Sequence, residues 1–136
     1  MKVFRLALFA VLAVPLISSG CVPLVIGAAA GGAGVYAASR DTIQGDTDVG
    51  FETLWDAAVT VTRVRGTIVK QDFDKGTIEA CEGKSIKIWV TLEKLTASTT
   101  RLKVASRKYK MPNLELAQTI YTKILDETKN NGTTVK

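Results

Sequence analysis

Hydrophobic and polar residues alternate most regularly between Ser85 and Leu95. One set of alternating positions is apolar (Ile86, Ile88, Val90, Leu92) and the other is mostly polar (Lys87, Trp89, Thr91, Glu93). A period of two predicts a β-strand with one buried face and one exposed face. Shorter versions of this pattern predict strands over 67–73, 77–81 and 99–109, the last with Leu102 and Val104 pointing inward. Turns containing Gly76, Gly83 and Ser98 separate the four strands and predict an antiparallel meander.

A period of 3.6 residues predicts one helix before this meander and one after it. The first covers residues 48–65, with Asp48 as its N-cap and Gly66 just beyond its end. Its apolar stripe consists of Phe51, Leu54, Trp55, Ala58 and Thr62, widened by Val61 and Val64. We expect Trp55 to be a core anchor, because its position on this stripe faces the sheet.

The second helix follows the strand breaker Met111-Pro112, with Asn113 as its N-cap, and stops at Asn130-Asn131-Gly132. Its buried stripe consists of Ala117, Ile120, Tyr121, Ile124 and Leu125. With a short strand within 40–47, the order becomes β-α-β-β-β-β-α. We predict an α+β fold, with an antiparallel four- to five-stranded sheet and both helices on one face. The single domain covers residues 40–132, and residues 133–136 form a frayed tail.

The first 20 residues have the layout of a secretory signal peptide. Lys2 and Arg5 precede an apolar run, and the small residues Ser18, Ser19 and Gly20 lead into Cys21. The pattern resembles the bacterial lipobox, which implies cleavage before Cys21, lipidation of its thiol, and anchoring of the mature chain by three acyl chains. Val22 in place of Asp implies, by the same resemblance, sorting to the outer membrane. An ordinary signal peptide with an incidental Cys, or an uncleaved anchor helix, are the alternatives.

Residues 22–39 carry no charge and are rich in small residues. They include Gly27, Gly31, Gly32 and Gly34. Two interpretations remain: an inserted helix that self-associates through its glycines, or an apolar tether that lies at the membrane surface or against the domain. The run Gly32-Ala33-Gly34-Val35-Tyr36-Ala37 matches the G-x-G-x-x-A dinucleotide motif, but the βαβ unit that this motif requires is not predicted around it.

Composition narrows the possible chemistry. The chain has 136 residues, a net charge of +5, two Cys and no His. Lipidation of Cys21 would leave Cys81 without an intrachain partner, so Cys81 would be either buried or paired with another chain. The absence of His removes the commonest general base and metal ligand. We therefore expect a non-enzyme without cofactor or metal, in which Asp72, Asp74, Glu79 and Glu82 are solvated turn carboxylates.

A basic cluster is the strongest surface signal. Five cations and no acid lie within residues 101–110: Arg101, Lys103, Arg107, Lys108 and Lys110. On a strand, Arg101, Lys103 and Arg107 share a face, and we predict that Lys87 and Trp89 extend it into a partner surface. This surface could bind an envelope protein, anionic lipid, or another anionic envelope polymer. Alternatively, the cations protect an edge strand from aggregation. An extracytoplasmic location argues against nucleic acid.

Several stretches resemble a family of small bacterial lipoproteins known only as a domain of unknown function. They are the lipobox, the tether GAAAGGAGVYAAS, the Phe51-x-x-x-Trp55-x-x-Ala58 helix and the hairpin GTIVKQDFDKGTIEA. The expected function is a membrane-anchored, periplasm-facing, non-catalytic binding or envelope-assembly module. In an alternative, the glycine-rich segment drives oligomerisation and the protein is structural. A hydrolase of envelope polymers is a third possibility, which the missing His disfavours.

Overall fold

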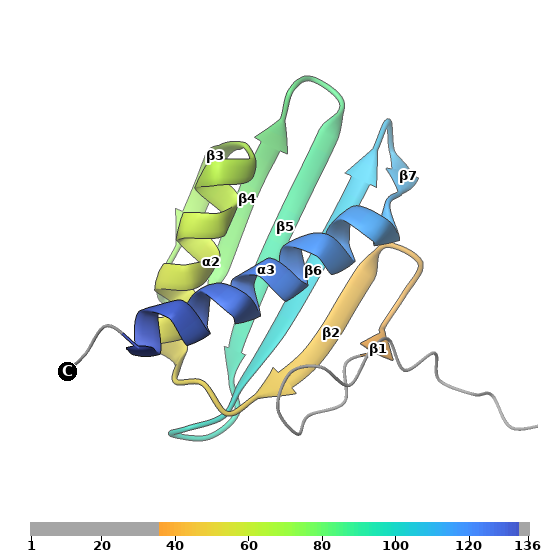
Figure 1. Cartoon of the computed structure of the whole chain (residues 1–136). Coiled ribbons are helices and arrows are strands. Elements are labelled where there is room, and N and C mark those ends of the chain that lie inside the picture. Colours follow the sequence, from red (N-terminus) through yellow and green to blue (C-terminus); the bar gives the residue numbers. More distant parts are fainter. Residues whose placement is uncertain (1–35, 134–136) are drawn as a thin grey trace, which may run out of the picture.

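Antiparallel strands form one sheet in the order β1-β2-β6-β5-β4-β3, and the short β7 pairs with β6 (Figure 1). The computed structural model describes residues 36–133. The strands are β1 (Tyr36–Ala37), β2 (Thr42–Thr47), β3 (Thr67–Asp72), β4 (Thr77–Glu82), β5 (Ile86–Lys94), β6 (Thr100–Lys108) and β7 (Met111–Pro112). The helices α2 (Phe51–Arg65) and α3 (Leu114–Thr133) lie on the same face of the sheet and contact each other.

The predicted α+β class and the placement of both helices on one face are confirmed. The sheet is larger than predicted, because two strands of two residues each extend it at β1 and β7. Strand β1 falls inside residues 21–39, which the sequence assigns to a tether, so the end of that range belongs to the sheet. The predicted signal peptide, Cys21 and the glycines at 27, 31, 32 and 34 lie outside the described residues.

The core lies between the helices and one face of the sheet. The predicted burial of alternate residues in β5 and β6 is confirmed. The side chains at most 1% exposed include Ile88, Val90, Leu102 and Val104. Helix α2 covers β3, β4 and β5, whereas α3 covers β2 and β6. All five predicted core residues of α3 are buried: Ala117, Ile120, Tyr121, Ile124 and Leu125. No helix within residues 36–133 is long and apolar enough to cross a membrane.

Helix α2 confirms the predicted stripe in its centre and departs from it at both ends. Trp55 is buried and makes edge-to-face contact with Phe73, their ring centroids 5.3 Å apart. Asp48 is not the N-cap: Gly50 occupies that position, and the Asp48 carboxylate accepts a hydrogen bond from Thr99 instead. Val64 is 86% exposed, because at the end of the helix its side of the stripe turns away from the sheet.

Two glycines are required by close packing of the backbone. Gly66 follows α2, as predicted, in an extended conformation, and its N–H donates to the Thr62 carbonyl at 2.9 Å. A Cβ there would lie 2.7 Å from the Cys81 carbonyl oxygen, so only glycine allows α2 to run directly into β3 beside β4. Gly76 has φ +62, and a Cβ on it would clash with the Leu92 carbonyl.

Helix α3 begins as the sequence predicts. The Asn113 side-chain oxygen accepts a hydrogen bond from the Leu116 N–H at 3.4 Å, which is the N-cap arrangement. Its end is later than predicted, since the helix continues through Asn130-Asn131-Gly132 to Thr133. Local stop signals are weak predictors of helix ends, which vary by one or two residues and fray.

Candidate functional site

The face of the sheet opposite the helices, called the open face below, has no covering element among the described residues (Figure 1). The register of β5 and β6 brings four pairs of side chains together on it: Lys87 with Arg107, Trp89 with Ala105, Thr91 with Lys103, and Glu93 with Arg101. Residues directly opposite each other on antiparallel strands point to the same face. The structure therefore gathers all five residues of the predicted partner surface on the open face.

The strand that carries these cations is central in the sheet. Strand β6 lies between β2 and β5, and the outer positions of the main sheet belong to β1 and β3. The interpretation of Arg101, Lys103 and Arg107 as protection of an edge strand is therefore wrong. Their role must come from the open face itself.

Trp89 lies near the middle of the open face. It is half-buried, with Ala105 opposite on β6 and Glu79 opposite on β4. The Arg107 guanidinium carbon lies 6.0 Å from the centroid of the indole ring, at the outer limit of a cation–π contact. An aromatic ring among small and charged neighbours is typical of an interaction hot spot, where Trp and Arg are enriched.

The basic side chains of the open face are paired with acids. Arg101 makes two hydrogen bonds to the Asp46 carboxylate, at 2.6 and 3.0 Å. The Lys103 ammonium lies 3.3 Å from Glu93, and the Arg107 guanidinium 2.5 Å from Asp41. The run 101–110 contains no acid, but β5, β2 and the loop before β2 supply one for each of these three cations. The open face consequently carries both positive and negative side chains in pairs and is not a purely basic patch.

Asp41 is a member of the charged cluster at the open face that the sequence does not predict. Its carboxylate accepts hydrogen bonds from the Ser39 hydroxyl at 2.7 Å, the Thr42 hydroxyl at 2.9 Å and the Arg107 guanidinium. The Ser39 and Arg107 hydrogen bonds lower the pKa of Asp41 to about 2, against the opposing effect of burial. The permanently ionised Asp41 thus holds Arg107 beside Trp89. Only the pairing of β2 with β6, which no local pattern encodes, brings these residues together.

Two acids near the hairpin turns make contacts of other kinds. Asp72 accepts the backbone N–H of Lys75, which lowers the pKa of Asp72 and closes the β3–β4 turn. Glu82 points to the opposite face, where it lies 3.1 Å from the Arg65 guanidinium of α2. Across residues 36–133, no three His, Cys, Asp or Glu side chains come close enough together to bind a metal ion.

Cys81 is free and half-buried. It lies opposite Lys87 on β5 and Thr67 on β3, which places its thiol on the open face. No base is positioned beside it among the described side chains, since the chain has no His and Lys87 is exposed. The thiol is therefore a neighbour of the predicted partner surface.

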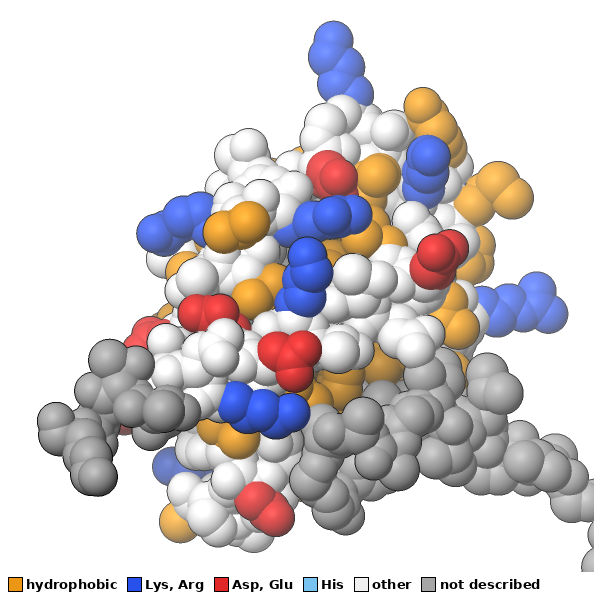
Figure 2. All heavy atoms as spheres, viewed as in Figure 1, with side chains coloured by type: hydrophobic (Ala, Val, Ile, Leu, Met, Phe, Trp, Pro, Cys, Tyr) orange, Lys and Arg blue, Asp and Glu red, His pale blue; other side chains and the backbone are white. Residues whose placement is uncertain are grey.

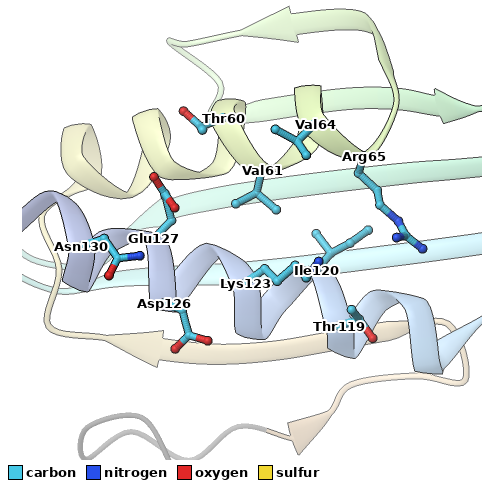
Figure 3. A pocket seen from close by; sticks show the side chains of 10 residues that line it. All are labelled: Thr60, Val61, Val64, Arg65, Thr119, Ile120, Lys123, Asp126, Glu127 and Asn130. Carbon is cyan, nitrogen blue, oxygen red and sulfur yellow. The ribbon is translucent and has the colours of Figure 1, made fainter.

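A groove lies on the helix layer. It has a volume of about 270 Å³ and runs between α2 and α3, with Val61 and Ile120 toward its base (Figure 3). Charged side chains from both helices surround it: Arg65, Lys123, Asp126 and Glu127. Lys and Arg side chains are interspersed with Asp and Glu over this surface, with apolar side chains between them (Figure 2). The groove could hold one or two aliphatic side chains and contains no reactive group.

A family model described as "Protein of unknown function (DUF3568)" matches residues 2–108 of the chain. The match extends from the N-terminal segment through α2 and ends at the last residue of β6. It thus includes β5 and β6, the two strands at the centre of the open face. No curated protein matches the chain.

Proposed function

The chain belongs to the DUF3568 family of proteins of unknown function, and we propose that it is a membrane-anchored, non-catalytic binding module of the bacterial envelope. The observation that carries the proposal is the uncovered sheet face with Trp89 at its centre and ordered ion pairs around it. Exposed charges held in fixed geometry on a rigid sheet form a pattern that a partner can read. The lipobox-like segment ending at Cys21 supports the anchored location.

The proposed occupant of the open face is another envelope protein. An anionic lipid or polymer would have to compete with Asp46, Glu93 and Asp41 for the cations that those carboxylates already neutralise. A protein surface can instead place acids against cations and cations against acids while it buries the indole of Trp89. Protein interfaces commonly combine such a polar rim with an aromatic anchor.

In-cell photocrosslinking tests this proposal. A photoreactive phenylalanine analogue replaces Thr91 on the open face or, as a matched control, the exposed Asp56 on α2. We expect a protein adduct from position 91 alone, reduced at least about tenfold by Trp89→Ala, because hot-spot truncations cost more than about 1.4 kcal/mol. The absence of an adduct at 91, or equal adducts at 91 and 56, would contradict the proposal. A lipid or glycan adduct would favour the polymer alternative.

A charge exchange separates recognition from folding. Arg101→Asp combined with Asp46→Arg keeps an ion pair between the two positions, but the positive charge moves from β6 to β2 and the negative charge from β2 to β6. We expect loss of the adduct at position 91 and only a small decrease of the thermal midpoint, because the new acid at position 101 lies opposite Glu93 on β5. An unchanged adduct would show that this pair plays no part in recognition.

The membrane anchor has its own test. Cells fed a labelled fatty acid should incorporate the label into the wild-type chain and not into a Cys21→Ser variant. An unlabelled wild type would remove the anchor from the proposal and leave the open face to be judged by the crosslinking result.

A further inference from the structure

The turn between β6 and β7 has an unusual backbone. Lys108 pairs with Met111, so Tyr109 and Lys110 are the two residues of the turn, and their φ angles are +50° and +68°. Two consecutive positive φ values are the signature of a type I′ turn, which normally contains Asn-Gly because larger side chains are disfavoured there. Strain of this kind in a non-glycine pair indicates that the side chains serve a purpose other than forming the turn.

The side chains of this turn project away from the domain. Tyr109 is 72% exposed and Met111 is 69% exposed, so neither contributes to the core. The backbone, by contrast, is fixed: the Tyr109 N–H donates to the Ser85 carbonyl at 2.9 Å. This hydrogen bond ties the turn to the neighbouring β4–β5 turn at the same end of the sheet (Figure 1). The result is a rigid projection that presents an aromatic and a thioether side chain to whatever lies beyond that end.

The cations at this end differ from those of the open face. Lys108, Lys110 and Lys84 are exposed, and none of them forms an ion pair with a described residue. Of the nearest acids, Asp41 and Glu82 are paired with arginines, which leaves Glu115 in the first turn of α3 as an exposed carboxylate. The net positive charge that the open face lacks is concentrated here.

From these observations we infer that the tip formed by Lys84, Lys108, Tyr109, Lys110 and Met111 docks on the surface of an anionic phospholipid bilayer. Tyr favours the headgroup region, where its ring is apolar and its hydroxyl stays hydrated, and Lys side chains extend to the phosphates. Each Lys near an anionic leaflet strengthens association by about fivefold. Contact by one turn is weak alone, but a membrane anchor would keep the tip at high local concentration.

This site is distinct from the protein-binding face, and it would set the orientation of that face relative to the membrane. If the tip touches the bilayer, the strands stand upright on the membrane surface, and the open face is directed along the plane of the membrane. The anchor of the proposed function supplies the high local concentration, but contact with the lipid depends only on the chemistry of the tip.

Photocrosslinking to vesicles tests the inference. The full chain carries the photoreactive phenylalanine analogue at Tyr109 or, as a control, at the exposed Ser98 in the turn at the opposite end of the sheet. It is illuminated with excess vesicles of phosphatidylcholine, with or without phosphatidylglycerol, and lipid adducts are measured by mass spectrometry. We expect adducts at 109 only with phosphatidylglycerol, at least about tenfold above those at 98. Flotation of the unilluminated sample with vesicles of phosphatidylcholine alone reports anchoring without the tip, so a failed anchor and a failed tip are distinguished.

Two variants complete the test. Lys108→Gln with Lys110→Gln should lower the adduct yield at 109 by about 25-fold, from about fivefold for each Lys. Lys70→Gln with Lys94→Gln, which changes exposed lysines away from the tip, should leave it unchanged. Equal yields at 109 and 98, no adduct at 109, equal yields without phosphatidylglycerol, or no effect of the first pair of substitutions would each overturn the inference.

Discussion

Adjacent residues of β6 serve the two faces of the sheet in opposite ways. Leu102 and Val104 are fully buried beneath the helices, whereas Arg101 and Lys103 lie in ion pairs on the open face. Burial of apolar side chains contributes about 1.5–3 kcal/mol each, while exposed ion pairs contribute at most about 1 kcal/mol. One face therefore contributes most of the stability of the domain, and substitutions on the other face should cost little stability.

The strongest test of this division compares two neighbouring substitutions. Leu102→Ala removes buried methyl groups at the centre of the core and should lower the free energy of unfolding by about 2–5 kcal/mol. Lys103→Ala breaks an exposed pair and should lower it by less than about 1 kcal/mol. Urea unfolding of both variants measures the difference. Similar losses would show that the open face also stabilises the fold.

Gly76 and Gly83 test how tightly the backbone packs at the two hairpin turns. Gly76 and Gly83 have nearly equal φ values, +62° and +63°, so an Ala at either position incurs a similar left-handed cost of about 1–2 kcal/mol. A Cβ on Gly83 meets nothing within 4 Å, but one on Gly76 clashes with the Leu92 carbonyl and approaches Phe51. We expect Gly76→Ala to lose about 1–3 kcal/mol more than Gly83→Ala, from overpacking. Equal losses in thermal unfolding would mean that the turn relaxes freely.

The two faces also differ in how far the sequence could predict them. Periodicity predicts the covered face, because Ile88, Val90 and Leu92 recur at every second position of β5. Each apolar residue in such a series indicates which way the residue beside it points. The Asn113 cap is similarly local. Asp48 was misassigned because its spacing suits a cap, while its actual partner, Thr99, lies far away in the sequence.

The open face depends on the register between distant strands. The composition of 101–110 predicts a basic patch, and only the pairing of β2 with β6 reveals that Asp46 neutralises Arg101. The predicted partner residues were nevertheless gathered on one face, because strand alternation alone determines that Trp89 and Arg107 avoid the helices. The tip at Tyr109 could not be anticipated, since Tyr-Lys carries no signature of a type I′ turn.

The pH dependence of the free energy of unfolding tests whether Asp41, at the margin of the open face, also stabilises the fold. The pKa of Asp41 is about 2 in the folded chain and 3.8 in the absence of structure. Because the folded pKa is the lower one, the ionised carboxylate stabilises the fold above about pH 4, and this contribution disappears as the pH falls to about 2. Its size is on the order of 2 kcal/mol. Asp41→Asn should thus destabilise the domain at pH 7 and have little effect near pH 2.

Subtracting the unfolding curve of Asp41→Asn from that of the wild type isolates this contribution from Asp46, whose pKa is also lowered by its hydrogen bond from Arg101. A difference that stays constant between pH 7 and pH 2 would contradict the assignment. The expected decrease would identify one polar cluster at the margin of the open face that stabilises the fold.

The last prediction concerns the tip, where a double substitution should raise the free energy of unfolding by a small amount. Tyr109→Asn with Lys110→Gly installs the residues that a type I′ turn prefers, and it should raise the free energy of unfolding by about 1 kcal/mol, after allowance for the greater freedom of Gly in the unfolded chain. Neither native side chain contributes to the core, so nothing is lost in exchange. A stabilised variant that no longer contacts anionic vesicles would show that the native turn sacrifices stability for binding. Destabilisation would instead mean that Tyr109 packs on the domain, and the tip would then belong with the covered face as part of the fold.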